Sequence, residues 1–300
     1  MIKPLKLIPA YKDYIWGGDK LKTIYGKKTD VSPLAESWEL SCHKDGMAYL
    51  SNGMSLEEYI SKNKGCLGTM CPSDELPVLI KFIDAQDNLS VQVHPTDEQA
   101  QVWENQNGKT EMWYVAGAEK DAKITCGFNR DVTEEELKNA IEQNTLEELL
   151  SVYDSKKGDV FFVEAGTVHA IGKGNLIVEV QQNSNVTYRL YDYNRVGKDG
   201  KTRELHIEKG IKASNLKKTI LNNRNGCILA KCKYFQVTEI KCNEEVNLCA
   251  DEKSYHALVV VEGNIELENK NFVAGETIFI PAGAGEYKLI GNATVLLTTN

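Results

Sequence analysis

The sequence GDVFFVEAG at residues 158–166 returns near the end of the chain as GETIFIPAG at residues 275–283. Each copy has a glycine, an acidic residue, a run of four β-forming residues and a turn that ends in Ala-Gly. Aromatic and β-branched residues favour strands, and the flanking turn residues end them. Because self-similarity of this kind indicates duplicated structural units, we expect a mainly β protein with two related β-barrels.

The two copies differ in the residues that come directly after them. The first continues to His169, whereas the second continues through Ala284 and Gly285 without a histidine at that place. We therefore expect the site-bearing unit to lie in residues 1–225 and a related barrel without a metal to occupy residues 226–300.

Four candidate metal ligands lie between residues 92 and 169. Gln92 and His94 belong to one β-like run and would point to the same face, because strand side chains alternate. Glu111 opens a second β-like run, and His169 comes after a third. Two neutral histidines and a carboxylate form a known zinc set, and an amide oxygen is compatible with it. Any one of these residues alone would more often be a polar group lining a barrel; their combination favours a metal site.

A helical segment is expected between these ligands, around residues 131–151. Thr133 followed by Glu136 is a capping box, and Leu137, Ile141 and Leu146 have apolar helical spacing. The acidic residues of this segment are most simply a solvated surface. The pattern predicts a small helical insertion in an otherwise β-rich first domain.

Composition limits the class of protein. The chain has 300 residues, 42% hydrophobic and 26% charged, which is ordinary for a globular protein. A formal charge of −8 argues against a nucleic-acid partner but leaves room for a small phosphorylated ligand. No apolar run approaches the roughly 20 residues of a membrane helix, and the first residues lack the pattern of a secretory signal. We therefore expect no membrane partner and a cytoplasmic location.

Lys81 interrupts a strongly apolar strand, residues 76–84. A lysine in such a run usually reaches the surface with its ammonium group. Its place shortly before the Gln92-x-His94 run raises the alternative that it lines a polar cavity and meets an anion.

With these motifs in place, the sequence resembles the cupin superfamily. Gly158-Asp159, Gly166-x-x-His169 and Asn175 match its second motif, while Gln92-x-His94 replaces the commoner His-x-His of its first. That replacement, with KTEMWY at residues 109–114 and YIWGG at residues 14–18, is similar to type I mannose-6-phosphate isomerase in its short bacterial form. The resemblance implies two cupin-type jelly-roll barrels, a catalytic one in residues 1–225 and a degenerate one in residues 226–300.

The resemblance also implies an activity and roles for particular residues. The activity would be zinc-dependent aldose–ketose isomerisation, which interconverts mannose 6-phosphate and fructose 6-phosphate by proton transfer between C2 and C1. One zinc ion per chain would be held by positions matching the family ligands, Gln92, His94, Glu111 and His169. Arg189 matches an active-site arginine, Glu179 and Lys109 match polar groups near the metal, and Ser90, Lys81 and Arg195 fall near positions of phosphate or substrate contact.

Several roles stay open from sequence. Arg189 would either stabilise developing negative charge or grip phosphate. Glu179 would act as a base or support a metal ligand, and Lys109 would be an acid, a phosphate contact or a surface charge.

Three other functions remain alternatives: an iron-dependent cupin oxygenase, a non-catalytic sugar-binding cupin, and a cupin isomerase of another phosphosugar. The sequence does not indicate an oligomeric state.

Overall fold

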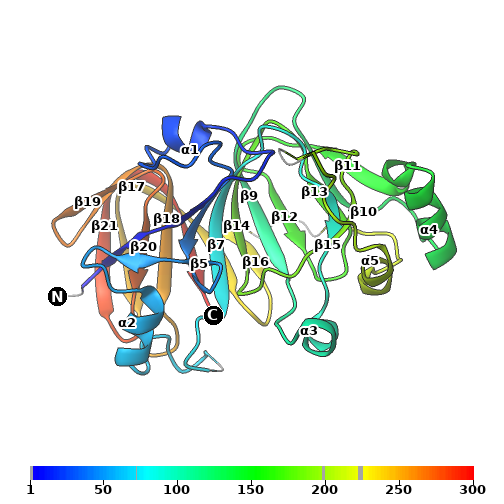
Figure 1. Ribbon diagram of the computed structural model, residues 1–300. Helices are drawn as coiled ribbons and strands as arrows, with labels where there is room; N and C mark the ends of the chain where they lie inside the picture. The colour runs from blue at the N-terminus through cyan, green and yellow to red at the C-terminus, as the bar shows by residue number, and fades with distance from the viewer. Residues whose placement is uncertain (1–2, 72, 198–199, 222–225) are drawn as a thin grey trace. The chain divides into compact units, whose positions relative to one another are not determined.

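The structure is a computed structural model that describes residues 3–71, 73–197, 200–221 and 226–300. It is mainly β, as predicted, and forms two compact units (Figure 1). The terminal unit comprises Met1–Asp13, Asp19–Phe82 and Asn223–Asn300, and the central unit comprises Tyr14–Gly18 and Ile83–Asn222. Among the described residues, no helix has the length and apolar character needed to cross a membrane.

The terminal unit is built on an eight-stranded sheet of order β16-β17-β21-β18-β20-β1-β6, with β19 paired to β18. Its long β17 and β21 pair along their whole length, from Gln236↔Thr299 to Ala250↔Gly285. A core of alternate aliphatic side chains, such as Leu258, Val260 and Val295, lies inside this second barrel. The elements of the unit are β1 Leu5–Ile8, β2 Ala10–Lys12, α1 Lys20–Thr23, β3 Glu36–Leu40, β4 Cys42–His43, β5 Gly46–Met47, β6 Tyr49–Leu50, α2 Leu56–Lys62, β7 Val78–Asp84 (which ends in the central unit), β16 Ile228–Lys231, β17 Gln236–Ala250, β18 His256–Leu267, β19 Lys270–Val273, β20 Thr277–Ile280 and β21 Gly285–Thr299.

The central unit has strands of two sheets. One has the order β11-β10-β13-β8-β15, and the other contains the consecutive strands β12-β9-β14. The elements are β8 Val91–Val93, α3 Asp97–Glu104, β9 Glu111–Ala118, β10 Lys123–Phe128, α4 Glu134–Glu142, η1 Leu146–Leu149, β11 Leu150–Asp154, β12 Val160–Val163, β13 His169–Ile171, β14 Asn175–Gln182, β15 Tyr188–Tyr191 and α5 Ile207–Ala213.

The repeated sequence forms equivalent local structures in the two units. Its four-residue run is strand β12 in the first copy and strand β20 in the second. The glycine that opens each copy, Gly158 or Gly275, has a φ of 91°, which residues with a side chain rarely adopt. The predicted duplication of a barrel motif is therefore confirmed.

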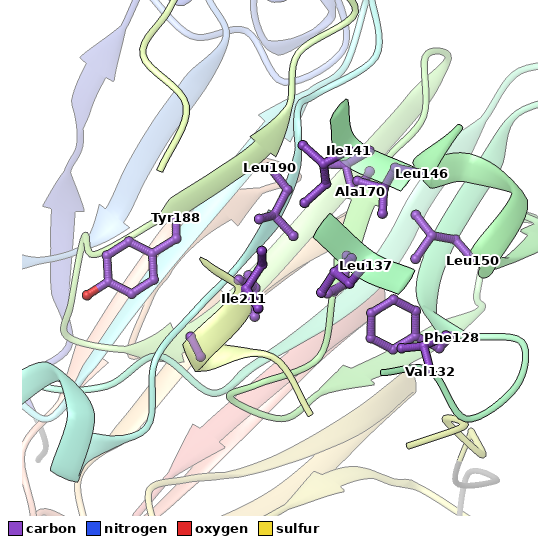
Figure 2. Close-up of a cluster of buried hydrophobic side chains, with 14 of the residues drawn as sticks. Phe128, Val132, Leu137, Ile141, Leu146, Leu150, Ala170, Tyr188, Leu190 and Ile211 are labelled. Carbon is purple, nitrogen blue, oxygen red and sulfur yellow. The ribbon is translucent and has the colours of Figure 1, made fainter. Parts of the chain in front are cut away.

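The predicted helical insertion is α4 with the short helix η1. Thr133 and Glu136 form the full capping box at the start of α4. The apolar side of the insertion packs with α5 on the five-stranded sheet of the central unit (Figure 2). Leu137 and Ile141 of α4 meet Leu190 of β15 and Ala170 of β13 in one buried cluster. The helices therefore cover one face of this sheet, which leaves its other face for polar side chains.

Residues 19–82 pack with the C-terminal barrel in the terminal unit. The ammonium of Lys27 lies 2.5 Å from a carboxylate oxygen of Glu39 and 2.5 Å from the carbonyl oxygen of Gly275. Glu39 also accepts hydrogen bonds from the hydroxyls of Ser37 and Thr277. Side chains such as Lys27 thus bind the early chain to the repeated motif of that barrel, and the predicted division of the chain at residue 225 stays a prediction.

Candidate metal centre

Three of the predicted site residues form one row across the five-stranded sheet. Gln92 of β8 is paired with His169 of β13 on one side and with Arg189 of β15 on the other. Directly opposite residues of antiparallel strands point to the same face. Their neighbours Val91 and Ala170 point to the opposite face and join the cluster beneath the helices. Alternation along three strands thus separates a polar row from an apolar one.

Glu111 meets this row from the other sheet of the central unit. It begins β9, and its two carboxylate oxygens lie 3.6 Å from Nε2 of His94 and 3.4 Å from Nε2 of His169. One ligand atom from each of these three residues lies within 4.8 Å of the others, and all three residues are buried. The amide nitrogen of Gln92 is placed 3.4 Å from Nε2 of His169. The structure therefore brings all four predicted metal ligands together.

The hydrogen bonds of both histidines fix which ring nitrogen can bind a metal. Nδ1 of His94 is 2.8 Å from the carbonyl oxygen of Val186, and Nδ1 of His169 is 2.8 Å from that of Thr167. A carbonyl oxygen only accepts, so each Nδ1 carries the proton and donates it. Each Nε2 then carries a lone pair and faces Glu111, which is how a ligating histidine is oriented. The donor set of this site therefore fits a divalent metal ion.

Burial keeps this site in the protonation state that metal binding needs. Desolvation lowers the pKa of His169 to about 3, with a smaller contribution from the charge of Lys109, so its imidazole is neutral near pH 7. Cys126 is paired with His169 across β10 and β13. Burial, followed by the charge of Glu111, raises the pKa of the Cys126 thiol to about 12, so this neighbour stays a neutral thiol.

Lys109 and Glu179 border the ligands. The ammonium of Lys109 donates to a carboxylate oxygen of Glu111 at 2.5 Å and lies 3.1 Å from Nε2 of His94. Its distance to Oε1 of Glu179 is 3.9 Å. The indole N–H of Trp113 donates to the same Oε1 at 3.0 Å. Lys109 is 4% exposed, which excludes the surface charge considered for it from sequence.

Ser90 and Lys81, which were predicted to contact phosphate or substrate, lie in different parts of the structure. Ser90 is buried, and its hydroxyl donates to Oε1 of Gln92 at 3.3 Å. Lys81 belongs to the terminal unit, where its ammonium is 3.8 Å from Glu36 and 4.8 Å from the ring centre of Trp38. Lys81 is 4% exposed and does not reach the surface. Its predicted contact with phosphate stays a prediction.

Of the two predicted arginines, Arg189 ends the polar row, and Arg195 follows the end of β15. Arg189 is half-buried, and one terminal nitrogen donates to the carbonyl oxygen of Glu204 at 2.8 Å. Arg195 donates to the carboxylate of Asp192 at 2.6 Å and to the carbonyl oxygen of Asn88 at 2.5 Å.

The sequence interpretation missed two residues beside them, Asp192 and Arg203. Arg203 binds the carboxylate of Asp192 through two nitrogens, at 2.8 and 2.5 Å. Arg203 lies in a polar stretch without periodicity, so the only available signal was the density of arginines after β15.

The chain is therefore a cupin protein with a candidate metal site. It has two barrels, and one of them holds a cluster of two histidines and a glutamate between its sheets. Comparisons with known proteins assign the chain to one family within this class. Residues 5–131 match the family described as phosphomannose isomerase type I, catalytic domain, and residues 226–300 match mannose-6-phosphate isomerase, cupin domain.

Individual relatives agree with these family matches. The chain is 37% identical over 314 residues to mannose-6-phosphate isomerase ManA of Bacillus subtilis, covering 99% of this chain and 98% of that one. It is 39% identical over 215 residues to the mannose-6-phosphate isomerase of Streptococcus mutans, covering 70% and 67%. A crystal structure of the mannose 6-phosphate isomerase from Bacillus subtilis superposes with a TM-score of 0.90 at 30% identity, over 98% of this chain and 99% of that one. The chain therefore belongs to the type I mannose-6-phosphate isomerase family.

Proposed function

We propose that this protein is a zinc-dependent isomerase that interconverts mannose 6-phosphate and fructose 6-phosphate by moving a proton between C2 and C1. One zinc ion per chain would be held by Gln92, His94, Glu111 and His169. The observation that carries the proposal is the orientation of the two histidines, whose Nε2 atoms both face Glu111 while their Nδ1 atoms are bound to backbone carbonyls. Bound there, zinc supplies Lewis-acid polarisation of the sugar carbonyl.

Arg189 would act on the charge of the substrate. It shares a face with the ligands Gln92 and His169, because the three residues are paired across neighbouring strands. Its guanidinium would stabilise negative charge that develops on a sugar oxygen, or hold the phosphate through paired N–H donors. Phosphate would also be contacted by Ser90 and Arg195, and by Lys81 as the family resemblance implies.

Two buried groups are candidates for proton transfer, Glu179 and Lys109. Glu179 receives the indole N–H of Trp113 at one oxygen, which fixes the orientation of its carboxylate beside the ligands. Lys109 is bound to Glu111 and lies 3.9 Å from Glu179. As a base, Glu179 would take the proton from C2 or C1. As a positioning residue, it would act only through Lys109 and Glu111.

The test is a coupled assay of mannose 6-phosphate isomerisation, with bound metal measured by elemental analysis of the same sample. Activity should be lost after treatment with a chelator and should return with zinc. His94→Ala should lose both bound zinc and activity, since it removes one of two imidazole ligands. His43→Ala, which changes a histidine of the terminal unit, is the matched control and should retain zinc. Full activity in His94→Ala would refute the metal assignment.

Glu179→Gln separates the two roles of that residue. If Glu179 is the base, exchange of the C2 hydrogen with solvent should slow about a hundredfold to ten-thousandfold while zinc stays bound. If it only positions the ligands, C2 exchange should fall in parallel with zinc content.

The alternatives predict other outcomes of the same assay. A folded, zinc-loaded protein without turnover on mannose 6-phosphate would favour an isomerase of another phosphosugar, to be sought with a panel of aldose and ketose phosphates, or a sugar-binding cupin. Oxygen consumption with an iron-loaded sample would instead indicate an oxygenase. Residence in the cytoplasm stays a prediction of the sequence.

A further inference from the structure

Asp192 is held between two arginines at the end of β15. It is 5% exposed, and its carboxylate receives Arg195 at 2.6 Å and Arg203 through two nitrogens at 2.8 and 2.5 Å. A carboxylate that binds the fork of one guanidinium at both oxygens is fixed in its orientation. The position of Arg195 therefore depends on Arg203, because both bind the same oxygen of Asp192.

The backbone beside Asp192 adopts an unusual conformation. Tyr193 and Asn194 have φ values of 57° and 53°, a left-handed region that is uncommon for a bulky residue such as tyrosine. The turn is closed by the backbone N–H of Arg195, which donates to the carbonyl oxygen of Asp192 at 3.0 Å. Backbone conformations of this kind persist only where surrounding contacts hold them. Arg203 supplies such a contact from a separate part of the chain.

The segment that carries Arg203 also binds Arg189. The carbonyl oxygen of Glu204 accepts from a terminal nitrogen of Arg189 at 2.8 Å, and the backbone N–H of His206 donates to the carbonyl oxygen of Arg189 at 2.7 Å. Residues 203–206 thus bind Arg189 directly and are linked to Arg195 through the carboxylate of Asp192.

The three guanidinium groups are crowded relative to their counter-charges. Burial, and next the charge of Arg203, lowers the pKa of Arg189, with a further contribution from Arg195. Asp192 is buried among them, whereas Asp87, 3.5 Å from Arg195, and Glu204 are exposed to solvent. The Nε atoms of Arg189 and Arg195 are buried and have no hydrogen-bond partner among the described residues. Three guanidinium groups that share one buried carboxylate and have two unpaired N–H donors suit a bound dianion.

We propose that Arg203 is a positioning residue for phosphate recognition: through Asp192 it holds Arg195, and through its backbone neighbours it holds Arg189, in the arrangement that receives the phosphate of the substrate. This inference rests on the proposed function, which supplies the phosphorylated sugar. Arg203 acts on binding of the substrate and does not take part in proton transfer.

The experiment compares R203M, R203K and the native protein, all loaded with zinc. Steady-state kinetics give kcat and KM for mannose 6-phosphate, and calorimetric titration with inorganic phosphate gives a Kd. R203M should raise KM and the phosphate Kd together by about tenfold, the effect of losing charge-assisted hydrogen bonds that fix a binding group. Its kcat should stay within about twofold of native, since groups that bind without entering the chemistry change KM alone. R130M is the matched control, because Arg130 is exposed and pairs with Glu136 of α4.

R203K distinguishes the positioning effect of Arg203 from the effect of its positive charge alone. A lysine keeps the charge but cannot bind both oxygens of Asp192 in the same geometry, so KM and Kd should rise by an intermediate factor. If R203M does not fold, R203K carries the same comparison.

Unchanged KM and phosphate Kd in the folded variants would overturn the inference, as would a fall in kcat and zinc content with KM unchanged. If the native protein lacks isomerase activity, the proposed function fails, but the ratio of phosphate Kd values between native protein and R203M still decides the role of Arg203. Absence of phosphate binding by the native protein would refute it.

Discussion

Replacement of Lys27 by methionine tests how the early chain is joined to the C-terminal barrel. Lys27 and Glu39 are both buried, with 7% and 0% of their side chains exposed, and their charged atoms are 2.5 Å apart. Methionine keeps most of the length of the side chain but removes its charge. Glu39 would keep the hydroxyls of Ser37 and Thr277 as donors and lose its counter-charge.

The expected cost can be worked from the contacts that are lost. The ammonium of Lys27 makes two charge-assisted hydrogen bonds, to Glu39 and to the carbonyl oxygen of Gly275. Such bonds contribute about 1.5–3 kcal/mol each, and removal of one partner of a buried ion pair costs about 3–5 kcal/mol. We expect Lys27→Met to destabilise the terminal unit by about 4 kcal/mol. Adding Glu39→Gln removes the unpaired charge and should restore about half of this loss.

A local measurement is needed, since a chain with two units need not unfold in one step. Amide hydrogen exchange of β20 gives the free energy of opening of the terminal unit where Thr277 meets Glu39. Lys6→Met is the matched control: Lys6 pairs with Glu276 at the surface of the same barrel and should contribute less than about 1 kcal/mol. The reasoning is refuted if Lys27→Met costs no more than Lys6→Met, or if the double variant is no more stable than the single one.

Three further predictions concern stability. Asn175→Ala should cost about 3 kcal/mol in the free energy of opening measured by amide hydrogen exchange of β14, because buried Asn175 binds the hydroxyl of Ser155 and two backbone carbonyls; a cost below about 1 kcal/mol would contradict this. Leu137→Ala should cost about 2–5 kcal/mol without changing metal binding by the candidate site, since the helices cover the face of the sheet opposite its residues; weaker metal binding in a folded variant would contradict this. Burial lowers the pKa of His256 to about 4, against about 6.5 when unfolded. The unfolded state therefore binds more protons between these values, and stability falls with falling pH in that window. Between pH 7 and pH 5 the native protein should lose roughly 2 kcal/mol more than His256→Gln, and equal losses in parallel urea titrations would exclude the effect.

The sequence predicted those features that depend on local pattern. Alternation placed Gln92 and His94 on one face, and the capping box at Thr133 and Glu136 located the start of the insertion. The combination of ligand-type residues, supported by the family resemblance, assigned Glu111 and His169 to the same site, and the structure brings both together with His94. Each of these signals is carried by residue type at short spacing, or by a motif whose fold is known.

Contacts between distant segments left no comparable signal. Nothing in the sequence near Lys27 indicates a hydrogen bond to Gly275, 248 residues away. Likewise, Asp192 and Arg203 are 11 residues apart across a polar stretch and become partners only because the chain turns back beside β15. Such contacts depend on the packing of whole elements, so residue patterns alone could not predict them.

The separation of polar and apolar rows on β8, β13 and β15 has a consequence for how this protein can change in evolution. Substitution at Gln92 alters one contact, but a one-residue insertion before it would exchange the two faces of the rest of the strand. The site would then receive Val91 in place of Gln92, and the amide would lie under the helices. Insertions and deletions in these three short strands should therefore be eliminated by selection, whereas the exposed turns elsewhere in the chain can lengthen or shorten freely.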